Sequence, residues 1–322
     1  GGGRESAGVD GCYWSSTGDA GTAWYLYFYN GNPSMDTSEF SLGLSVRAVR
    51  GAPPPPVEYL DWDDAQKKMT NAVCKVFEVV KDDTATFKAG KTYVVLDNVK
   101  NTTGITVEGT AENPTRLILC DGAKLTVKGN DPAAGLKVGS TSALIICGQE
   151  LGTGALEATG DLNAAGIGDG NGAAGGSVTI NGGTVTATAE NDNLAIFNPQ
   201  DGTVTINGGT LTGYASAVEM RAGTLNITGG TLTATATEFS AAANGSGNTV
   251  VGAAVAISQH NTNKALAVNI SGGEFSGVKA VYEEDLQDET VDGISLAITG
   301  GKFAGEIASE NVTKFVSGGV FS

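Results

Sequence analysis

One short sequence occurs three times between Ser177 and Thr233, as SVTINGGTVT, TVTINGGTLT and TLNITGGTLT. Looser copies follow, so that Gly-Gly pairs begin at positions 182, 208, 229, 272, 300 and 318. A recurrence of about 20 to 28 residues is typical of a solenoid, in which each repeat is one coil that buries its apolar face only when neighbouring coils stack on it. The repeat therefore constrains the fold before any other feature of the chain.

Each repeat reads as strand, glycine corner, strand. Val178 and Ile180 alternate with Thr179 and Asn181, and this period of two sends the β-branched apolar side chains to one face. The Gly-Gly pair that follows supplies a corner where positive φ is needed. After each corner the inward position returns, and it is occupied in successive repeats by Val185, Leu211, Leu232, Phe275, Phe303 and Phe321.

The predicted fold class is all-β: a right-handed, single-stranded parallel β-helix, a pectin-lyase-like solenoid in which every strand pairs with its counterpart one coil above and below. The 48 glycines and 8 prolines in 322 residues agree, because they punctuate many short strands and leave little room for helices. The regular strand content predicts a structural scaffold, so we expect any binding or catalytic function to belong to modules attached to the solenoid.

The charge of the chain excludes two classes of partner. With 19 Lys plus Arg against 35 Asp plus Glu, the formal net charge is -16. Binding to nucleic acid or to anionic lipid would have to overcome this repulsion, so we expect neither. No apolar run of about 18 residues occurs, so we expect no membrane insertion in this segment.

No metal site and no cofactor site is predicted. Cys120 and Cys147 lie 27 residues apart, about one coil, so we expect two stacked, buried thiols, with a disulfide as the alternative. The single histidine, His260, has no partner motif. The glycine-rich segment 164–176 is followed by a strand and not by the helix that a phosphate-binding loop requires, so we interpret it as a packed turn. Asp169 and Asn171 remain possible calcium ligands, although the nonapeptide repeat of calcium-binding rolls is absent.

Residues 1–51 differ from the solenoid in being rich in aromatic residues. They contain YWSST at 13–17, the alternating strand AWYLYFY at 23–29, a Gly-Asn turn and a closing GLSVRAVR at 43–50. These ordered motifs resemble the C-terminal half of the Fib_succ_major paralogous domain, a C-type-lectin-like module of bacterial surface proteins. The resemblance implies a small, partial module at the N-terminus.

In relatives of this module the segment between the two motifs resembles the variable, ligand-facing region of lectin-like proteins. An exposed row of tyrosines supplies contact area at low entropic cost. The alternative is that these tyrosines covered the missing half of the domain. The resemblance implies the following candidate ligand-binding residues: Tyr25, Tyr27, Tyr29, Asn30, Asn32, Ser38 and Phe40.

Residues 52–58 contain four consecutive prolines, Pro53 to Pro56, which favour an extended spacer. We interpret residues 59–84 as an N-terminal cap that covers the first coil, with a short helix around 63–69 capped by Asp61 or Asp63 and with Trp62 in the lid. The β-helix itself is predicted over residues 85–322.

Further motifs, among them GKTYVV, LILCDGAKLTV and AAGIGDGNG, resemble a family of gut-bacterial cell-surface parallel β-helix proteins over about residues 57–322. The resemblance implies an extracellular or outer-surface protein and carries no defined activity. We expect a non-catalytic stalk or display scaffold in adhesion or glycan binding, with a glycan or another host or bacterial surface ligand as the partner.

The alternative is a polysaccharide lyase or glycoside hydrolase of the pectate-lyase-like β-helix type, whose chemistry needs paired carboxylates or calcium-binding aspartates beside a basic residue. The acidic cluster at 283–289 reads as a solvated loop between two repeats. The basic residues Arg221, Lys264, Lys279 and Lys302 are scattered in the sequence. No catalytic residue is therefore predicted. Mineral or ice binding by threonine arrays is disfavoured by the unequal repeat spacings.

Overall fold

The computed structural model describes the backbone of residues 11–19, 22–29 and 32–39, and most of residues 54–322. Within the second range it leaves out residues 131–133, 161–163, 165, 170–173, 190–193, 199–200, 244–247, 260–263 and 285–292, and describes only the backbone at 187–189, 194–195, 197–198, 243 and 248–249. The chain divides into two compact units, Gly1–Pro55 and Pro56–Ser322, which are described separately.

The first unit contains a three-stranded antiparallel sheet in the order β1-β2-β3. Its strands are β1 (Gly11–Asp19), β2 (Thr22–Tyr29) and β3 (Asn32–Glu39). The register places Tyr29 opposite Asn32, so Asn32, predicted as part of a Gly-Asn turn, is instead the first residue of β3.

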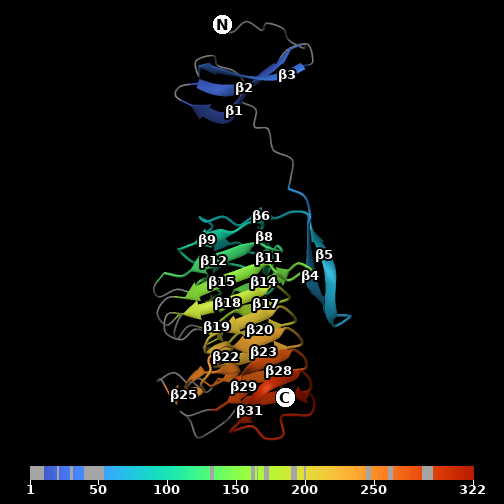
Figure 1. Cartoon of the computed structure of the whole chain (residues 1–322), viewed down its shortest axis with the longest axis vertical. Coiled ribbons are helices and arrows are strands. Elements are labelled where there is room, and N and C mark those ends of the chain that lie inside the picture. Colours follow the sequence, from blue (N-terminus) through green and yellow to red (C-terminus); the bar gives the residue numbers. More distant parts are fainter. Residues whose placement is uncertain are drawn as a thin grey trace. The chain divides into compact units, whose positions relative to one another are not determined.

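The second unit is built from long parallel sheets (Figure 1). The first row of strands is a nine-stranded sheet whose members pair in parallel with their neighbours. It consists of β6 (Glu78–Val79), β8 (Thr92–Val95), β11 (Thr115–Leu119), β14 (Ala143–Gly148), β17 (Ser177–Ile180), β20 (Thr203–Ile206), β23 (Gly223–Ile227), β28 (Leu266–Ile270) and β30 (Ile294–Ile298).

A 16-stranded sheet forms two further rows, which are joined because the long strand β29 (Glu274–Glu283) pairs with β24 along its first half and with β27 along its second. The second row contains β9 (Val99–Asn101), β12 (Lys124–Lys128), β15 (Ala155–Gly160), β18 (Thr184–Ala189), β21 (Thr210–Gly213), β24 (Thr231–Ala234), β29, β31 (Lys302–Ser309) and β32 (Val320–Phe321). The third row contains β7 (Thr86–Phe87), β10 (Ile105–Val107), β13 (Leu136–Lys137), β16 (Ile167–Gly168), β19 (Leu194–Asn198), β22 (Ser216–Met220), β27 (Ala253–Ile257) and then β29 and β31.

The order of pairing is regular. From β8 to β23, each strand of the first row pairs with the strand that comes three places later in the chain. Each passage of the chain thus adds one strand to each row, as a stacked repeat requires. The second unit is all-β in its described residues, with several long parallel sheets, and this arrangement is compatible with a β-solenoid.

The six Gly-Gly pairs line up along one edge, between the first and second rows, as the sequence predicts. The second glycine of each pair has positive φ, from 83° at Gly183 to 122° at Gly319. The first glycine is needed for a different reason: a Cβ at Gly229 would lie 2.5 Å from the carbonyl oxygen of Asn207 in the preceding coil. Both glycines are therefore required, one by conformation and one by close approach.

The inward positions form continuous columns of apolar side chains. After the glycine corner, Val185 is in register with Leu211, then Leu232, Phe275, Phe303 and Phe321. The rings of Phe275 and Phe303 stack at 4.8 Å, and those of Phe303 and Phe321 at 5.4 Å. All except the half-exposed Phe321 are buried. Burial of such side chains contributes roughly 1.5–3 kcal/mol each.

An inserted hairpin explains the largest gap between repeats. The strands β25 (Ser240–Ala243) and β26 (Asn248–Val251) pair with each other in antiparallel fashion between β24 and β27. A second apolar cluster joins the inserted hairpin to β29: Val250 of β26 and Tyr282 of β29 are buried, and Phe239 packs against them. The coils on either side of the insertion remain in register, because β24 pairs directly with β29.

The short helix predicted within the cap is not formed. Instead of a helix at 63–69, β4 (Val57–Asp63) and β5 (Lys68–Cys74) form an antiparallel hairpin. Asp63 accepts hydrogen bonds from the backbone N–H of Ala65 and Gln66, both at 2.9 Å, and so stabilises a turn in place of a helix. The hairpin lies alongside the first row of strands (Figure 1), whereas β6, which also belongs to the predicted cap, pairs with β8 at the end of that row.

Candidate binding groove

A groove of about 860 Å³ separates the β4–β5 hairpin from the outer face of the first row. We call it the hairpin groove. The hairpin contributes Asp61, Trp62, Asp64 and Lys67. The strand face contributes polar side chains that come mostly from the repeats: Arg116, Thr179, Asn181, Thr205, Asn207, Asn226, Thr228 and Ser271, with the apolar Ile145.

A chain of hydrogen bonds links three coils to the hairpin. The Asn181 Nδ2 donates to Asp61 Oδ1 at 2.8 Å, and the Asn207 Nδ2 donates to Asn181 Oδ1 at 3.0 Å. The hydroxyl of Thr228 then donates to Asn207 Oδ1 at 2.8 Å. All three bonds point the same way, toward the carboxylate, so each one polarises the next. The asparagine before the glycine pair therefore builds a fixed polar edge.

Asp61 also forms the principal ionic contact of the hairpin. Its Oδ2 accepts from Arg116 Nη2 at 2.9 Å, and both side chains are about three-quarters buried. The Arg116 guanidinium lies 5.5 Å from the centroid of the Tyr59 ring. Burial acts to lower the pKa of Arg116, but Asp61, Cys147 and Tyr59 raise it overall. The carboxylate thus neutralises a cation that the strand face would otherwise leave half-buried and unpaired.

Two neighbours of this ion pair, the buried Cys147 and the half-buried Tyr59, have raised pKa values. Burial, followed by the charge of Asp61, raises the pKa of the Cys147 thiol to about 12. Burial is also the largest cause that raises the pKa of the Tyr59 hydroxyl. Both groups stay protonated at neutral pH, so neither adds charge to the groove.

The two cysteines predicted to stack are not opposite each other. Cys147 is in register with Ile118, and Cys120 lies two residues beyond that position. Both thiols are free, and both side chains are buried as expected. The spacing of 27 residues differs from the true coil length here, which is why the register could not be obtained from the sequence.

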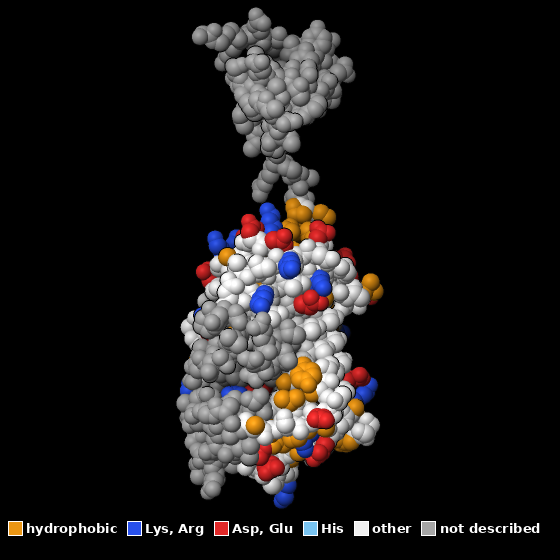
Figure 2. Space-filling model, turned by 60° about the vertical axis from the view of Figure 1, so that its left-hand side comes forward, with side chains coloured by type: hydrophobic (Ala, Val, Ile, Leu, Met, Phe, Trp, Pro, Cys, Tyr) orange, Lys and Arg blue, Asp and Glu red, His pale blue; other side chains and the backbone are white. Residues whose placement is uncertain are grey.

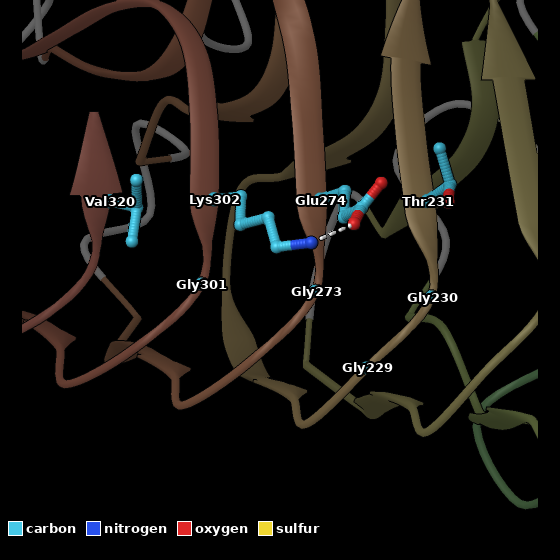
Figure 3. A pocket seen from close by; sticks show the side chains of 8 residues that line it. All are labelled: Gly229, Gly230, Thr231, Gly273, Glu274, Gly301, Lys302 and Val320. Atoms are coloured by element: carbon cyan, nitrogen blue, oxygen red, sulfur yellow. Dashed lines mark hydrogen bonds and ion pairs between the residues drawn. The ribbon is translucent and has the colours of Figure 1, made fainter. Parts of the chain in front are cut away.

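A second hollow lies over the glycine edge near the C-terminal coils, with a volume of about 630 Å³ (Figure 3). Gly230, Gly273 and Gly301 form its floor, and Glu274 and Lys302 reach toward each other above it and pair at 2.7 Å. The peptide groups beneath are bonded between coils, as in the 2.8 Å bond from Glu274 N to Gly230 O. The hollow follows from the absence of side chains at the glycines.

The candidate ligand-binding residues of the N-terminal unit stay predictions. Tyr25, Tyr27 and Tyr29 belong to β2, and Asn32 and Ser38 to β3, but their side chains lie outside the described residues. Asn30 and Phe40 lie outside them entirely. Sequence reasoning missed the hairpin groove, since it treated Trp62 as part of a lid and the repeated Asn and Thr residues as ordinary exposed strand positions.

The basic residues described as scattered each have an acidic partner in space. Arg221 pairs with Glu219 at 2.7 Å, and both side chains are buried. Lys279 pairs with Glu306 at 2.8 Å and lies 4.6 Å from the centroid of the Phe239 ring. Lys264 pairs with Asp201, and Lys302 with Glu274. Arg221 and Glu219 are two residues apart, but the other three pairs join different coils and cannot be recognised from the local sequence.

The predicted solvated acidic loop is wrong for its first two members. Glu283 ends β29 and Glu284 follows it, and both are buried. Glu283 accepts hydrogen bonds from the Ser309 hydroxyl at 2.5 Å and from Asn311 Nδ2 at 3.0 Å. Burial, together with the charge of Glu310, raises the pKa of Glu284. Residues 285–289 lie outside the described part of the chain.

The described residues contain no group of three or more His, Cys, Asp or Glu side chains placed to hold a metal ion. Asp169 lies 3.6 Å from the Lys137 ammonium, while Asn171 lies outside the described residues. No helix in this part of the chain has the length and apolarity needed to cross a membrane.

Comparison of the chain with protein-family models, with curated proteins and with solved structures found no match.

Proposed function

We propose that the chain is a right-handed, single-stranded parallel β-helix that serves as a non-catalytic scaffold of a bacterial surface or secreted protein, in adhesion or glycan binding. The observation that carries the proposal is the continuity of the stack. Apolar columns repeat in register along the described coils of the second unit, with Gly-Gly corners from Gly182 onward, and polar Thr and Asn residues alternate with them along the strands. Such a stack presents the outer side chains of successive coils at a fixed spacing, and so can form a binding surface.

The distribution of charge supports the non-catalytic part of the proposal. In the hairpin groove, Asp61 is held by Arg116 and Asn181, and Asp64 is exposed beside Lys67. Neither arrangement resembles two facing carboxylates that could act as acid and base on a sugar. On the face drawn in Figure 2, charges of both signs intermingle over the described residues, so this face offers a polyanion no large patch of one sign.

The N-terminal unit enters the proposal through its resemblance to a C-type-lectin-like module. In this reading the β-helix displays the module at an extracellular or outer-surface location, and the tyrosines of β2 contribute to ligand binding.

A glycan array probed with the whole chain tests the proposal. We expect binding to one or a few saccharide classes without any change in their length. The array experiment is paired with incubation of the chain with polygalacturonate, followed by size-exclusion chromatography. Absence of binding across the array argues against glycan binding, and shortening of the polyuronate would establish the polysaccharide lyase or hydrolase instead.

A further inference from the structure

We infer that the hairpin groove binds a linear, uncharged polysaccharide that lies along the stacking direction of the coils. This inference rests on the proposed function, and it names both the site and the class of glycan.

The shape of the groove fits an extended chain. Its volume of about 860 Å³ falls within the range of roughly 300–1,000 Å³ typical of ligand sites. Its lining runs along the first row from Arg116 in β11 to Ser271, just after β28. The hairpin forms one side, and the strand face forms the floor. A ligand that follows the groove therefore crosses several coils.

The floor presents a hydroxyl or amide side chain at a fixed interval. Thr179 is in register with Thr205, and Thr205 with Asn226. Neighbouring strands in a sheet lie about 4.8 Å apart, so these side chains recur with that period along the groove. Pyranose rings in an extended polysaccharide present their hydroxyl groups at a similar interval. Successive coils can thus make equivalent hydrogen bonds to successive sugars.

The charge of the groove selects against ionic ligands. Its four charged side chains form two pairs, Asp61 with Arg116 at 2.9 Å and Asp64 with Lys67 at 3.3 Å. No excess charge is left to bind a uronate or a sulfate, and the net charge of -16 repels polyanions at long range. The chemistry of the floor, amides and hydroxyls, is that which recognises neutral sugar hydroxyls.

Trp62 gives the groove an aromatic contact. Its indole Nε1 donates to Asp64 Oδ1 at 3.1 Å, which restrains the ring at the hairpin end of the groove. Aromatic rings with one polar edge are well suited to the apolar C–H face of a sugar, because they offer a large contact area with few rotatable bonds. The hollow over the glycine edge has no aromatic residue in its lining and is a poorer candidate.

The test measures binding of the whole chain to soluble mixed-linkage β-glucan, xylan and galactomannan, with polygalacturonate as the anionic comparison. Titration calorimetry is carried out on the wild type and on Trp62→Ala and Thr205→Val. The matched control is Thr233→Val, the same half-buried residue type on β24 in the second row, outside the groove. Circular dichroism checks that each variant is folded.

We expect at least one neutral polysaccharide to bind, with affinity reduced at least tenfold by Trp62→Ala and several-fold by Thr205→Val, and unchanged by Thr233→Val or by 0.5 M salt, a concentration chosen to screen surface charges. If both groove variants bind as the wild type does, while Tyr25→Ala with Tyr27→Ala abolishes binding, the groove is refuted and glycan binding stands. A preference for polygalacturonate also overturns the inference. If the wild type binds no glycan, the proposed function fails with it.

Discussion

Asp61→Asn should weaken the attachment of the β4–β5 hairpin to the strand face. The substitution keeps an oxygen that can accept from Asn181 but removes the charge that neutralises Arg116. Loss of an exposed ion pair costs about 0.2–1 kcal/mol, and loss of one partner of a fully buried pair about 3–5 kcal/mol. The Arg116 and Asp61 side chains are 28% and 24% exposed, so an intermediate cost of about 2 kcal/mol is expected.

Hydrogen exchange measured by mass spectrometry on peptides that cover β4 tests this value. A cost of about 2 kcal/mol corresponds to roughly a 30-fold increase in the population of the detached hairpin, and so to a similar acceleration of amide exchange when opening is local. Peptides from β20 and β23, which do not contact Asp61, should keep their protection.

The matched control is Asp64→Asn in the same hairpin. Asp64 pairs only with Lys67, and the two side chains are 87% and 73% exposed, so a change below about 0.5 kcal/mol is expected. Equal exchange rates in the two variants would show that the Asp61 network does not hold the hairpin against the strand face.

Three further predictions concern the stack itself. Phe303 lies within a column of stacked rings, so Phe303→Ala should destabilise the fold by about 3–5 kcal/mol in denaturant unfolding. The Phe321 side chain is half-exposed, so Phe321→Ala should destabilise it by clearly less. Equal effects of the two substitutions would contradict the packing. Gly209→Ala should lower stability more than Gly122→Ala, because both residues have positive φ but only at Gly209 does a Cβ meet a backbone oxygen, at 2.8 Å. Cys147 should resist iodoacetamide at pH 8 until the protein unfolds, because its raised pKa keeps the reactive thiolate scarce below about pH 12. The half-buried Cys74 should react before Cys147. Early labelling of Cys147 would argue against its burial.

The sequence predicts the stack well because its determinants are local. Alternation at Val178 and Ile180 defines the inward face, and the paired glycines mark each corner, so the edge on which they align follows from the repeat alone. The hairpin at 57–74 could not be predicted in this way. Asp63 is suited both to a helix N-cap and to a turn, and the contact of Asp61 with Arg116 and Asn181 decides between them only after folding. The groove was missed for the same reason: its two walls lie far apart in the sequence.

The corners of the second unit differ in how much their length varies: the corners with Gly-Gly pairs, which form the glycine edge, keep a constant length, and the others do not. Three residues connect the first row to the second in five successive coils, from Ile180 to Thr184 and finally from Ile298 to Lys302. The corners that lead into and out of the third row accept very different lengths, including the whole β25–β26 hairpin. An engineer who wishes to graft a new loop should therefore choose a third-row corner. A side chain or an added residue at the glycine edge would force neighbouring coils apart.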